Sequence, residues 1–594
     1  MRALILATVS FLLFPRAVMA TRFDDAALAC EAGLAKQLRV CLKDVNAAVE
    51  SCYAETNASC ASDDLRVAEA LAALETHIYA DCPTAAVADA GYGPSFDAST
   101  LVARTRETCL GEAASLAARA FGGPQAAVLA ATDEAGRECL SRAFKEGARL
   151  IERNYKTASA CVRKAHGGST CDPARLTSKL AKAQVKTAEK LARMCPNIAD
   201  LIGVDAAAFA ARAAAQARCV VPVAHGDTGP VALDCGPRSA APVPVRGEAV
   251  QVVLNNSTWG TRCGDGSSYA FWIRLAPEGS PLDRVVFQMQ GGGVCLSGPD
   301  CATRPVGLFT ALDETMPTVG HFSNDPAVNP FANWTKVFLP YCTQDIHIGG
   351  GVTNAYPEIT VHRYGAPNVR AALRYVRDVL WAALDDEDAQ GFRPDRLTVF
   401  FGGTSAGGWG TSLNYHYVLD DLRWIHTTAV PDAGLGLNSG AQTESPGDWS
   451  ARAYLPPYCF ADGCTSIPAL QARTSVRLEA TPEQQFLVVS NQVDSTQRST
   501  QGFSTMTDFI NALRAAYCTN KGLPGLHYFL PASSTSIHGL LNKSTTFPSM
   551  TSAGATLGDW LWSAFANPDA VVDRVEEGTL VADYGATPFA CPLD

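Results

Sequence analysis

The sequence predicts a chain of two parts, an all-α region rich in cysteine followed by an α/β region with a mostly parallel sheet. Composition changes near residue 225, because all nine tryptophans lie after it, whereas eleven of the twenty cysteines lie in residues 21–220. Long helix-forming stretches fill the first region, and apolar strand-like runs alternate with helical stretches in the second. At 594 residues the chain is long enough for two domains that each bury a core.

The first twenty residues have the pattern of a secretory signal peptide. Arg2 precedes an apolar run from Ala3 to Phe14, and small residues precede a cleavage position after Ala20. This run is too short for a membrane span, and no later stretch approaches the roughly 18 uninterrupted apolar residues that a spanning helix needs. We therefore expect residues 1–20 to be removed and the mature chain to be secreted, either extracellular or periplasmic.

The cysteine count, the net charge and the motifs that are missing argue against some classes of function. Twenty cysteines, an even number in an exported chain, indicate disulfide bonds. A formal net charge of −11 argues against a nucleic-acid partner, because binding to phosphates needs a basic surface. The chain contains neither a CxxC pair nor an HExxH motif, so the sequence predicts no metal site.

Residues 21–220 are predicted to form a separate all-α domain whose role the sequence does not reveal. The predicted helices cover 24–55, 62–80, 98–120, 126–165, 173–193 and 198–217. Cys30, Cys41 and Cys52 share one helix face, because a spacing of eleven residues rotates a helix by only about 20°. Since small alanine side chains bury little apolar area, we expect disulfides from this face to neighbouring helices. A carbohydrate or a protein partner are candidate ligands of this domain.

Residues 221–247 are rich in proline and glycine and are predicted to be a linker, which leaves 248–594 as the second domain. Its predicted strands are 285–290, 336–341, 397–402, 424–430, 486–490 and 526–530. Its predicted helices include 366–385, 407–419 and 505–518. Alternation on this scale predicts a sheet with helices on both faces.

The most informative segment for chemistry is LTVFFGGTSAGGWGT, residues 397–411. A β-branched and aromatic strand leads into Gly403-Thr404-Ser405-Ala406-Gly407, and a helical stretch follows. This is the pattern of a nucleophile elbow, a tight strand-to-helix turn that presents a serine between glycines. GxSxG alone also occurs in glycine-rich structural turns, so the strand before it and the helix after it carry the prediction. We expect an α/β-hydrolase-like fold with Ser405 as its nucleophile.

A second glycine-rich segment supplies candidate donors for an oxyanion hole. A predicted strand leads directly into residues 291–293, which are all glycine. In α/β-hydrolases the loop after an early strand donates one amide, and the residue after the nucleophile donates another. The backbone N–H groups of Gly292, Gly293 and Ala406 are therefore predicted to bind the oxyanion. The structural alternative is a flexible turn close to two cysteines.

The remaining triad members are predicted from chain order. Asp494 follows a late strand, where this fold carries the acid, and Asp432 after an earlier strand is its rival. His538 follows the last predicted strand and precedes the final helix. The order Ser405, Asp494, His538 is the order that α/β-hydrolases use. In this scheme the histidine is the general base, and the carboxylate fixes its tautomer. No cofactor is predicted.

At these positions the chain resembles the pectin acetylesterase/Notum family of carboxylesterases, over about 250–590. The matching segments are QGGGVCLSGPDC (290–301), NPFANWTKVFLPYCTQDIHIGG (329–350), GGTSAGGWGTSLN (402–414) and the strands that lead to Asp494 and His538. The resemblance implies the triad Ser405, Asp494 and His538 and the oxyanion donors Gly292, Gly293 and Ala406. Members of this family remove acyl groups from esters, including acetyl from pectin and a lipid acyl group from a signalling protein.

The chain departs from the family at the acyl pocket, because many animal and plant members carry a tryptophan where Gly293 stands. The resemblance therefore implies hydrolysis of a small or polysaccharide-linked ester, with pectin as one such substrate, and does not extend to the lipid-removing activity. Nothing in residues 21–225 resembles the family. Two alternatives stay open at this point: a lipase or peptidase on the same fold, and a catalytically inactive disulfide-rich binding protein.

Overall fold

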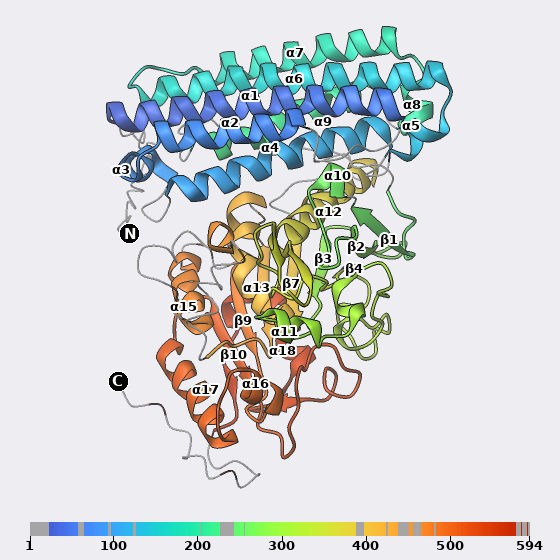
Figure 1. The fold of residues 1–594 in the computed structure, drawn as a ribbon. Coiled ribbons are helices and arrows are strands. Elements are labelled where there is room, and N and C mark those ends of the chain that lie inside the picture. The colour runs from blue at the N-terminus through green and yellow to red at the C-terminus, as the bar shows by residue number, and fades with distance from the viewer. Residues whose placement is uncertain are drawn as a thin grey trace, which may run out of the picture.

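A computed structural model describes the chain from residue 23 to residue 577, with gaps, together with residues 584 and 591 (Figure 1). The positions outside the description are 1–22, 58–64, 93–96, 123–125, 204, 226–242, 255, 388–396, 423, 425, 438–448, 450, 456–463, 465, 480, 482, 578–583, 585–590 and 592–594. The predicted signal peptide and most of the predicted linker fall among them. None of the described helices is long and apolar enough to cross a membrane.

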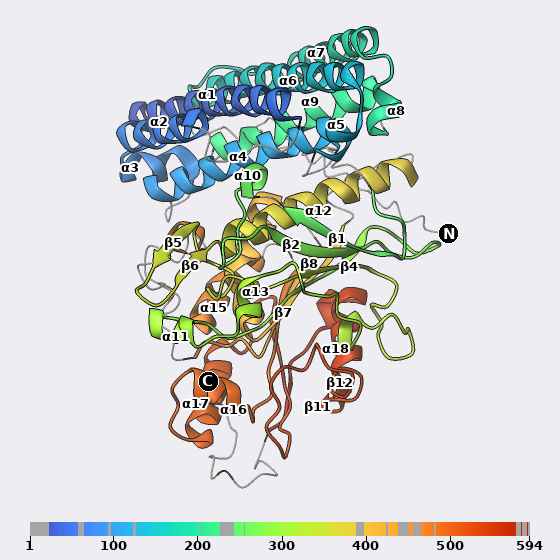
Figure 2. The same cartoon turned by 45° about the vertical axis from the view of Figure 1, so that its right-hand side comes forward.

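Helices dominate the described N-terminal part, which confirms the predicted all-α character of this region. They are α1 (Asp25–Thr56), α2 (Leu65–Asp81), α3 (Thr84–Val87), a π-helical turn (Ala88–Tyr92), α4 (Ala98–Phe121), α5 (Ala127–Ala131), α6 (Glu134–His166), α7 (Pro173–Met194), α8 (Ile198–Ile202) and α9 (Ala206–Ala224). Figures 1 and 2 show the long helices side by side as a slab that lies across one end of the sheet-containing part.

Single capping residues break two stretches that the sequence predicts as continuous helices. Asp133 accepts a hydrogen bond from the backbone N–H of Gly136, and this cap starts α6 after the short α5. Gly203, with a φ of 72°, ends α8, and Asp205 caps the start of α9. The prediction of unbroken helices over 126–165 and 198–217 was wrong because a local cap outweighs the good helix propensity of the alanines around it.

Disulfides connect α1 to its neighbours, as the eleven-residue cysteine spacing predicts. Cys30 bonds to Cys82 just after α2, and Cys41 bonds to Cys109 in α4. Cys52 is disulfide-bonded as well. Further bridges within this part are Cys139–Cys195 and Cys161–Cys171. The bridges supplement a core in which alanine is a frequent side chain.

A nine-stranded sheet in the order β1-β2-β4-β3-β7-β8-β9-β10-β13 forms the centre of the second part. The strands are β1 (Ala249–Leu254), β2 (Tyr269–Arg274), β3 (Arg284–Met289), β4 (Thr335–Leu339), β7 (Thr398–Thr404), β8 (His426–Asp432), β9 (Gln484–Val489), β10 (Leu526–Leu530) and β13 (Arg574–Val575). β2 is antiparallel to both of its neighbours, and all other neighbouring pairs are parallel. The predicted mostly parallel sheet is confirmed, with β1, β2 and β13 added to the six predicted strands.

Helices cover both faces of the sheet, as predicted. The main ones are α12 (Gly365–Glu387), α13 (Ala406–Tyr417), α15 (Ile467–Leu478), α17 (Met506–Asn520) and α18 (Leu557–Ala566). Smaller elements are α10 (Asn256–Trp259), α11 (Gly298–Ala302), α16 (Ser495–Thr500) and the two-stranded ribbons β5 (Val352–Ala355) with β6 (Thr360–Arg363) and β11 (Thr551–Ser552) with β12 (Ala555–Thr556). Successive side chains of β7 point to opposite faces of the sheet. Phe401 packs in the core with α12 and α17, and Phe400 packs in the core with α18.

One buried carboxylate joins the helical slab to the second part. Glu107 of α4 accepts hydrogen bonds from Arg370 at 2.6 Å and Arg374 at 2.5 Å, both on α12. The three side chains are between 6% and 9% exposed. Burial acts to raise the pKa of Glu107, but the two guanidinium groups outweigh it and leave that pKa below its ordinary value. Farther along α4, Ala114 and Ala118 pack in the core of the second part.

Replacing Glu107 by Ala should destabilise the protein strongly, because two buried guanidinium groups then lose the carboxylate that they share. We expect a loss of about 3–5 kcal/mol in the free energy of unfolding at neutral pH. Because the folded-state pKa lies below the unfolded value of 4.5, this stabilisation is complete above that pH and is lost as the pH falls below it.

Thermal unfolding of wild type and Glu107→Ala between pH 3 and pH 8 measures this effect. The matched control is Glu75→Ala, because Glu75 pairs with Arg106 at 2.8 Å but both side chains are about 40% exposed. The control should lose less than about 1 kcal/mol. Equal losses in the two variants would contradict the role given to Glu107.

Candidate active site

Ser405 stands at the turn between β7 and α13. Its backbone has φ 61° and ψ −123°, a conformation that non-glycine residues rarely adopt. Its N–H donates to the backbone oxygen of Asp432 at the end of β8, at 2.8 Å. Its own oxygen accepts from the N–H of Trp409 and begins the hydrogen bonding of α13. The sharp turn exposes the serine side chain at the carboxyl edge of the sheet, as a nucleophile elbow requires.

Two glycines allow this turn to pack tightly. A Cβ at Gly407 would come within 2.1 Å of the backbone oxygen of Met289 in β3, and one at Gly403 within 2.2 Å of the oxygen of Gly407. The first turn of α13 therefore lies against the end of β3, where the glycine segment 291–293 begins. This close approach brings the backbone of the predicted oxyanion loop next to Ser405.

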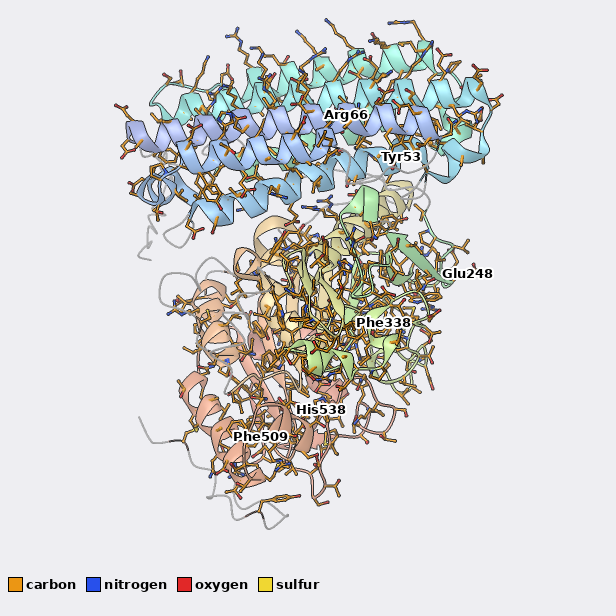
Figure 3. The ribbon with its side chains drawn as sticks, viewed as in Figure 1. Tyr53, Arg66, Glu248, Phe338, Phe509 and His538 are labelled. Carbon is orange, nitrogen blue, oxygen red and sulfur yellow. A yellow bond between two sulfur atoms is a disulfide. The ribbon has the colours of Figure 1, made fainter. Side chains whose placement is uncertain are left out.

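His538 and Asp494 are in direct contact. The Nδ1–H of His538 donates to Oδ2 of Asp494 at 2.8 Å. Asp494 is fully buried, and His538 is about one quarter exposed. Figure 3 shows His538 in the region of the second part that lies away from the N-terminal helices. A buried carboxylate on Nδ1 leaves Nε2 free to exchange a proton with a hydroxyl group.

Three further donors hold the Asp494 carboxylate. Asp494 is the N-cap of α16, and its Oδ1 accepts from the N–H groups of Thr496 and Gln497, each at 3.0 Å. The side-chain amide of Gln497 donates to Oδ2 at 2.9 Å and also to the hydroxyl of Ser490. Sequence reasoning did not find Gln497, although a glutamine three residues after an N-capping acid is a signal that could have indicated it.

Asp432, the rival acid, contacts the backbone beside the histidine, and within the described residues its carboxylate is not hydrogen-bonded to the imidazole. Its Oδ2 accepts from the N–H groups of Leu540 and Leu541 at 2.7 and 2.9 Å, and from the hydroxyl of Thr404 at 3.1 Å. Burial raises the pKa of Asp432 to about 6, although the two amides act to lower it. Asp432 therefore links the loop that carries His538 to Thr404, the last residue of β7 before Ser405.

The predicted oxyanion donors lie around the same turn. Ala406 is the first residue of α13, and a Cβ at Gly291 would lie 2.9 Å from Cβ of Ser405. Gly292 and Gly293 have φ values of 153° and 76°, which favour glycine. The loop after β4 supports this segment: the backbone oxygen of Gln290 accepts from Nε2 of His347 at 2.9 Å.

Ser405 and His538 line one small pocket of about 80 Å³. Two of the predicted oxyanion residues, Gly293 and Ala406, line it as well. The other lining residues are Val294, Ile346, Trp409, Ala433, Thr496, Gln497, Thr500 and Gln501. The sequence predicted none of these eight, because they come from several loops and helices whose packing no single motif specifies.

Two other histidines near the sheet are poor candidates for a general base. Burial lowers the pKa of His321 and of His347 to about 4. Nδ1 of His321 bonds to the backbone oxygen of Leu541, and Nε2 of His347 bonds to that of Gln290. Both rings therefore support loops of the site, and neither of them lines the pocket.

One comparison with known proteins places part of the chain in a known family. Residues 247–446 match the family model for pectinacetylesterases. The resemblance predicted from the sequence is confirmed over this range, which contains Ser405, Ala406 and the glycine segment and ends before Asp494. The match supports an esterase function for this part of the chain. No curated protein matches the chain.

Two solved structures to which the chain is similar are both of the Wnt deacylase Notum from Drosophila. Crystal form II is 19% identical, with a TM-score of 0.44 over 57% of this chain and 99% of that chain. Crystal form I is 20% identical, with a TM-score of 0.42 over 58% of this chain and 100% of that chain.

Substituting the two aspartates separates their roles. Asp494→Asn should lower kcat by about 10⁴-fold, because an amide at this position favours the wrong tautomer of His538. Asp432→Asn should lower kcat by less than about 10-fold, because asparagine keeps one oxygen to accept from the two amides. Steady-state hydrolysis of an aryl acetate measures both values. A larger loss in Asp432→Asn than in Asp494→Asn would make Asp432 the acid.

Proposed function

We propose that this chain is a secreted serine carboxylic-ester hydrolase that works through an acyl-enzyme. The hydrogen bond between His538 and Asp494, on the pocket that Ser405 also lines, is the observation that supports this most strongly. Export is supported by the signal-peptide pattern of residues 1–20 and by the disulfides of both parts.

The first half of the reaction acylates Ser405. His538 Nε2 takes the hydroxyl proton while the serine oxygen attacks the acyl carbonyl. The N–H groups of Gly292, Gly293 and Ala406 stabilise the resulting oxyanion, an interaction that typically contributes about 10²–10³ in kcat for each donor. Asp494 stabilises the imidazolium. The C–O bond to the leaving group then breaks, and the imidazolium returns its proton to the departing alkoxide.

The second half releases the acyl group. His538 deprotonates a water molecule, and the hydroxide attacks the acyl carbonyl of the ester on Ser405. The tetrahedral intermediate uses the same N–H donors. When it collapses, the serine oxygen leaves, takes the proton back from the imidazolium and releases a carboxylic acid. Proton balance is restored at each turnover without a cofactor.

A short acyl group fits the pocket best. The cavity at Ser405 is about 80 Å³, well below the roughly 300–1,000 Å³ of sites that enclose drug-sized ligands. Ile346 and Trp409 add apolar surface to the described lining. We therefore favour an acetyl ester, and the match to the pectinacetylesterase model favours a polysaccharide such as pectin as the group that carries it. A lipase or peptidase on the same fold, and an inactive binding protein, are the alternatives.

Removal of the nucleophile tests the proposal. Ser405→Ala should lower kcat for an aryl acetate by at least about 10⁴-fold while the thermal midpoint stays within a few degrees of wild type. The matched control is Ser499→Ala, an exposed serine of α16 that does not line the pocket, and its activity should equal wild type. Equal turnover in wild type and Ser405→Ala would refute the assignment.

Acyl preference can be measured with aryl esters of graded chain length. Because the described cavity is small, we expect kcat/KM for the acetyl ester to exceed that for the octanoyl ester by more than about 10-fold. A peptide substrate, run in parallel, should not be cleaved. A preference for octanoyl would indicate a lipase instead, and cleavage of the peptide would indicate a peptidase.

A further inference from the structure

The helical slab contains a buried carboxylate between two histidines, far from the candidate active site. Oε1 of Glu31 in α1 lies 2.5 Å from Nδ1 of His166, the last residue of α6, and 2.6 Å from Nδ1 of His225, which follows α9. All three side chains are at most 1% exposed. One donor atom from each residue lies within 4.8 Å of the others, which is compatible with shared binding of one ion.

Hydrogen bonds within the described residues leave this cluster incomplete. Oε2 of Glu31 and Nε2 of His166 are buried and have no hydrogen-bond partner there. A buried carboxylate oxygen without a partner costs free energy, and a cation bound at Glu31 removes that cost.

A divalent transition metal is an ion that Glu31 and the Nδ1 atoms of the two histidines can share. Zinc takes imidazole nitrogen and carboxylate oxygen as ligands, in sets that include two histidines and a glutamate. Its ligands lie about 2.0–2.2 Å from the metal, so the nitrogen and oxygen atoms would separate to about 3.4 Å, which a small side-chain rotation provides. The second oxygen of Glu31 can then complete the coordination.

The surroundings fit a metal site in two more ways. Nε2 of His225 lies 2.7 Å from the hydroxyl of Ser159, and metal-binding histidines commonly use their second nitrogen in such a bond. His166 ends α6 and His225 follows α9, so both stand at the negative end of a helix dipole, where a cation is favoured.

We propose that Glu31, His166 and His225 bind one zinc-class divalent cation, which fixes the start of α1 to the ends of α6 and α9. The ion is structural, because its ligands are buried and the site lies in the helical slab. It stabilises the C-terminal end of α9. It also secures the first described residues, since the ring of Phe23 packs on His166 at 4.2 Å and its N–H donates to the His166 oxygen.

Zinc titration of the full secreted chain tests this proposal directly. The chain is freed of metal with a chelator, and Zn²⁺ binding is followed by calorimetry together with the thermal midpoint. We expect one equivalent to bind and the midpoint to rise by several degrees. His166→Ala and His225→Ala should lose the zinc equivalent and the rise in midpoint. His77→Ala, an exposed histidine of α2, should keep both and is the matched control.

Ester hydrolysis serves as an independent readout, because the cluster is outside the triad. Activity at 25 °C should be retained in each folded variant whether or not the metal binds. If metal-free wild type binds no Zn²⁺ and its midpoint does not change, the metal site is refuted. If His166→Ala and His225→Ala both bind zinc as wild type does, the assigned ligands are wrong. Neither result bears on Ser405.

Discussion

The hydrogen bond between His538 and Asp494 is the interaction on which the proposed catalytic site depends. It exists because β7, β9 and β10 run parallel and end at one edge of the sheet, so that loops far apart in sequence meet there. Neighbouring groups fix the position of each of these two side chains. Gln497 and the start of α16 fix the carboxylate, and Asp432 fixes the loop that carries the imidazole. The geometry therefore rests on backbone and side-chain donors that do not themselves react.

The helical slab stands apart from this chemistry. It contacts the second part through α4, with Glu107 between two arginines and alanines in the sheet core, while His538 lies away from it (Figure 3). Its own order comes from disulfides that start on α1 and, on the metal proposal, from an ion at the ends of α6 and α9. Disulfides and a bound ion would both add stability to a bundle in which alanine supplies much of the core and buries little apolar area.

Local signals in the sequence were sufficient for the main elements. Ser405 was predicted because strand, glycine turn and helix are contiguous, and β10 was predicted with its observed bounds. β13 was missed because two residues carry no periodicity. The helix breaks at Asp133 and Gly203 were missed because one capping residue is a weak signal among alanines.

Contacts between residues far apart in the chain could not be predicted from local patterns in the sequence. Asp494 and His538 could be named only through the order that the fold imposes, and that assignment stays a prediction. Glu107 meets partners more than 260 positions away. Glu31 meets His225 at a separation of 194 residues. No spacing motif covers such intervals, which is why the sequence predicted no metal ligands.

Covalent labelling is the most direct test of the central claim, that Ser405 is a nucleophile activated by His538. Wild type is treated with a fluorophosphonate, and the modified peptide is identified by mass spectrometry. We expect one adduct, on Ser405, that forms far more slowly in His538→Ala although the variant stays folded. No adduct on Ser405, or labelling of Ser405 at the wild-type rate in His538→Ala, would contradict it.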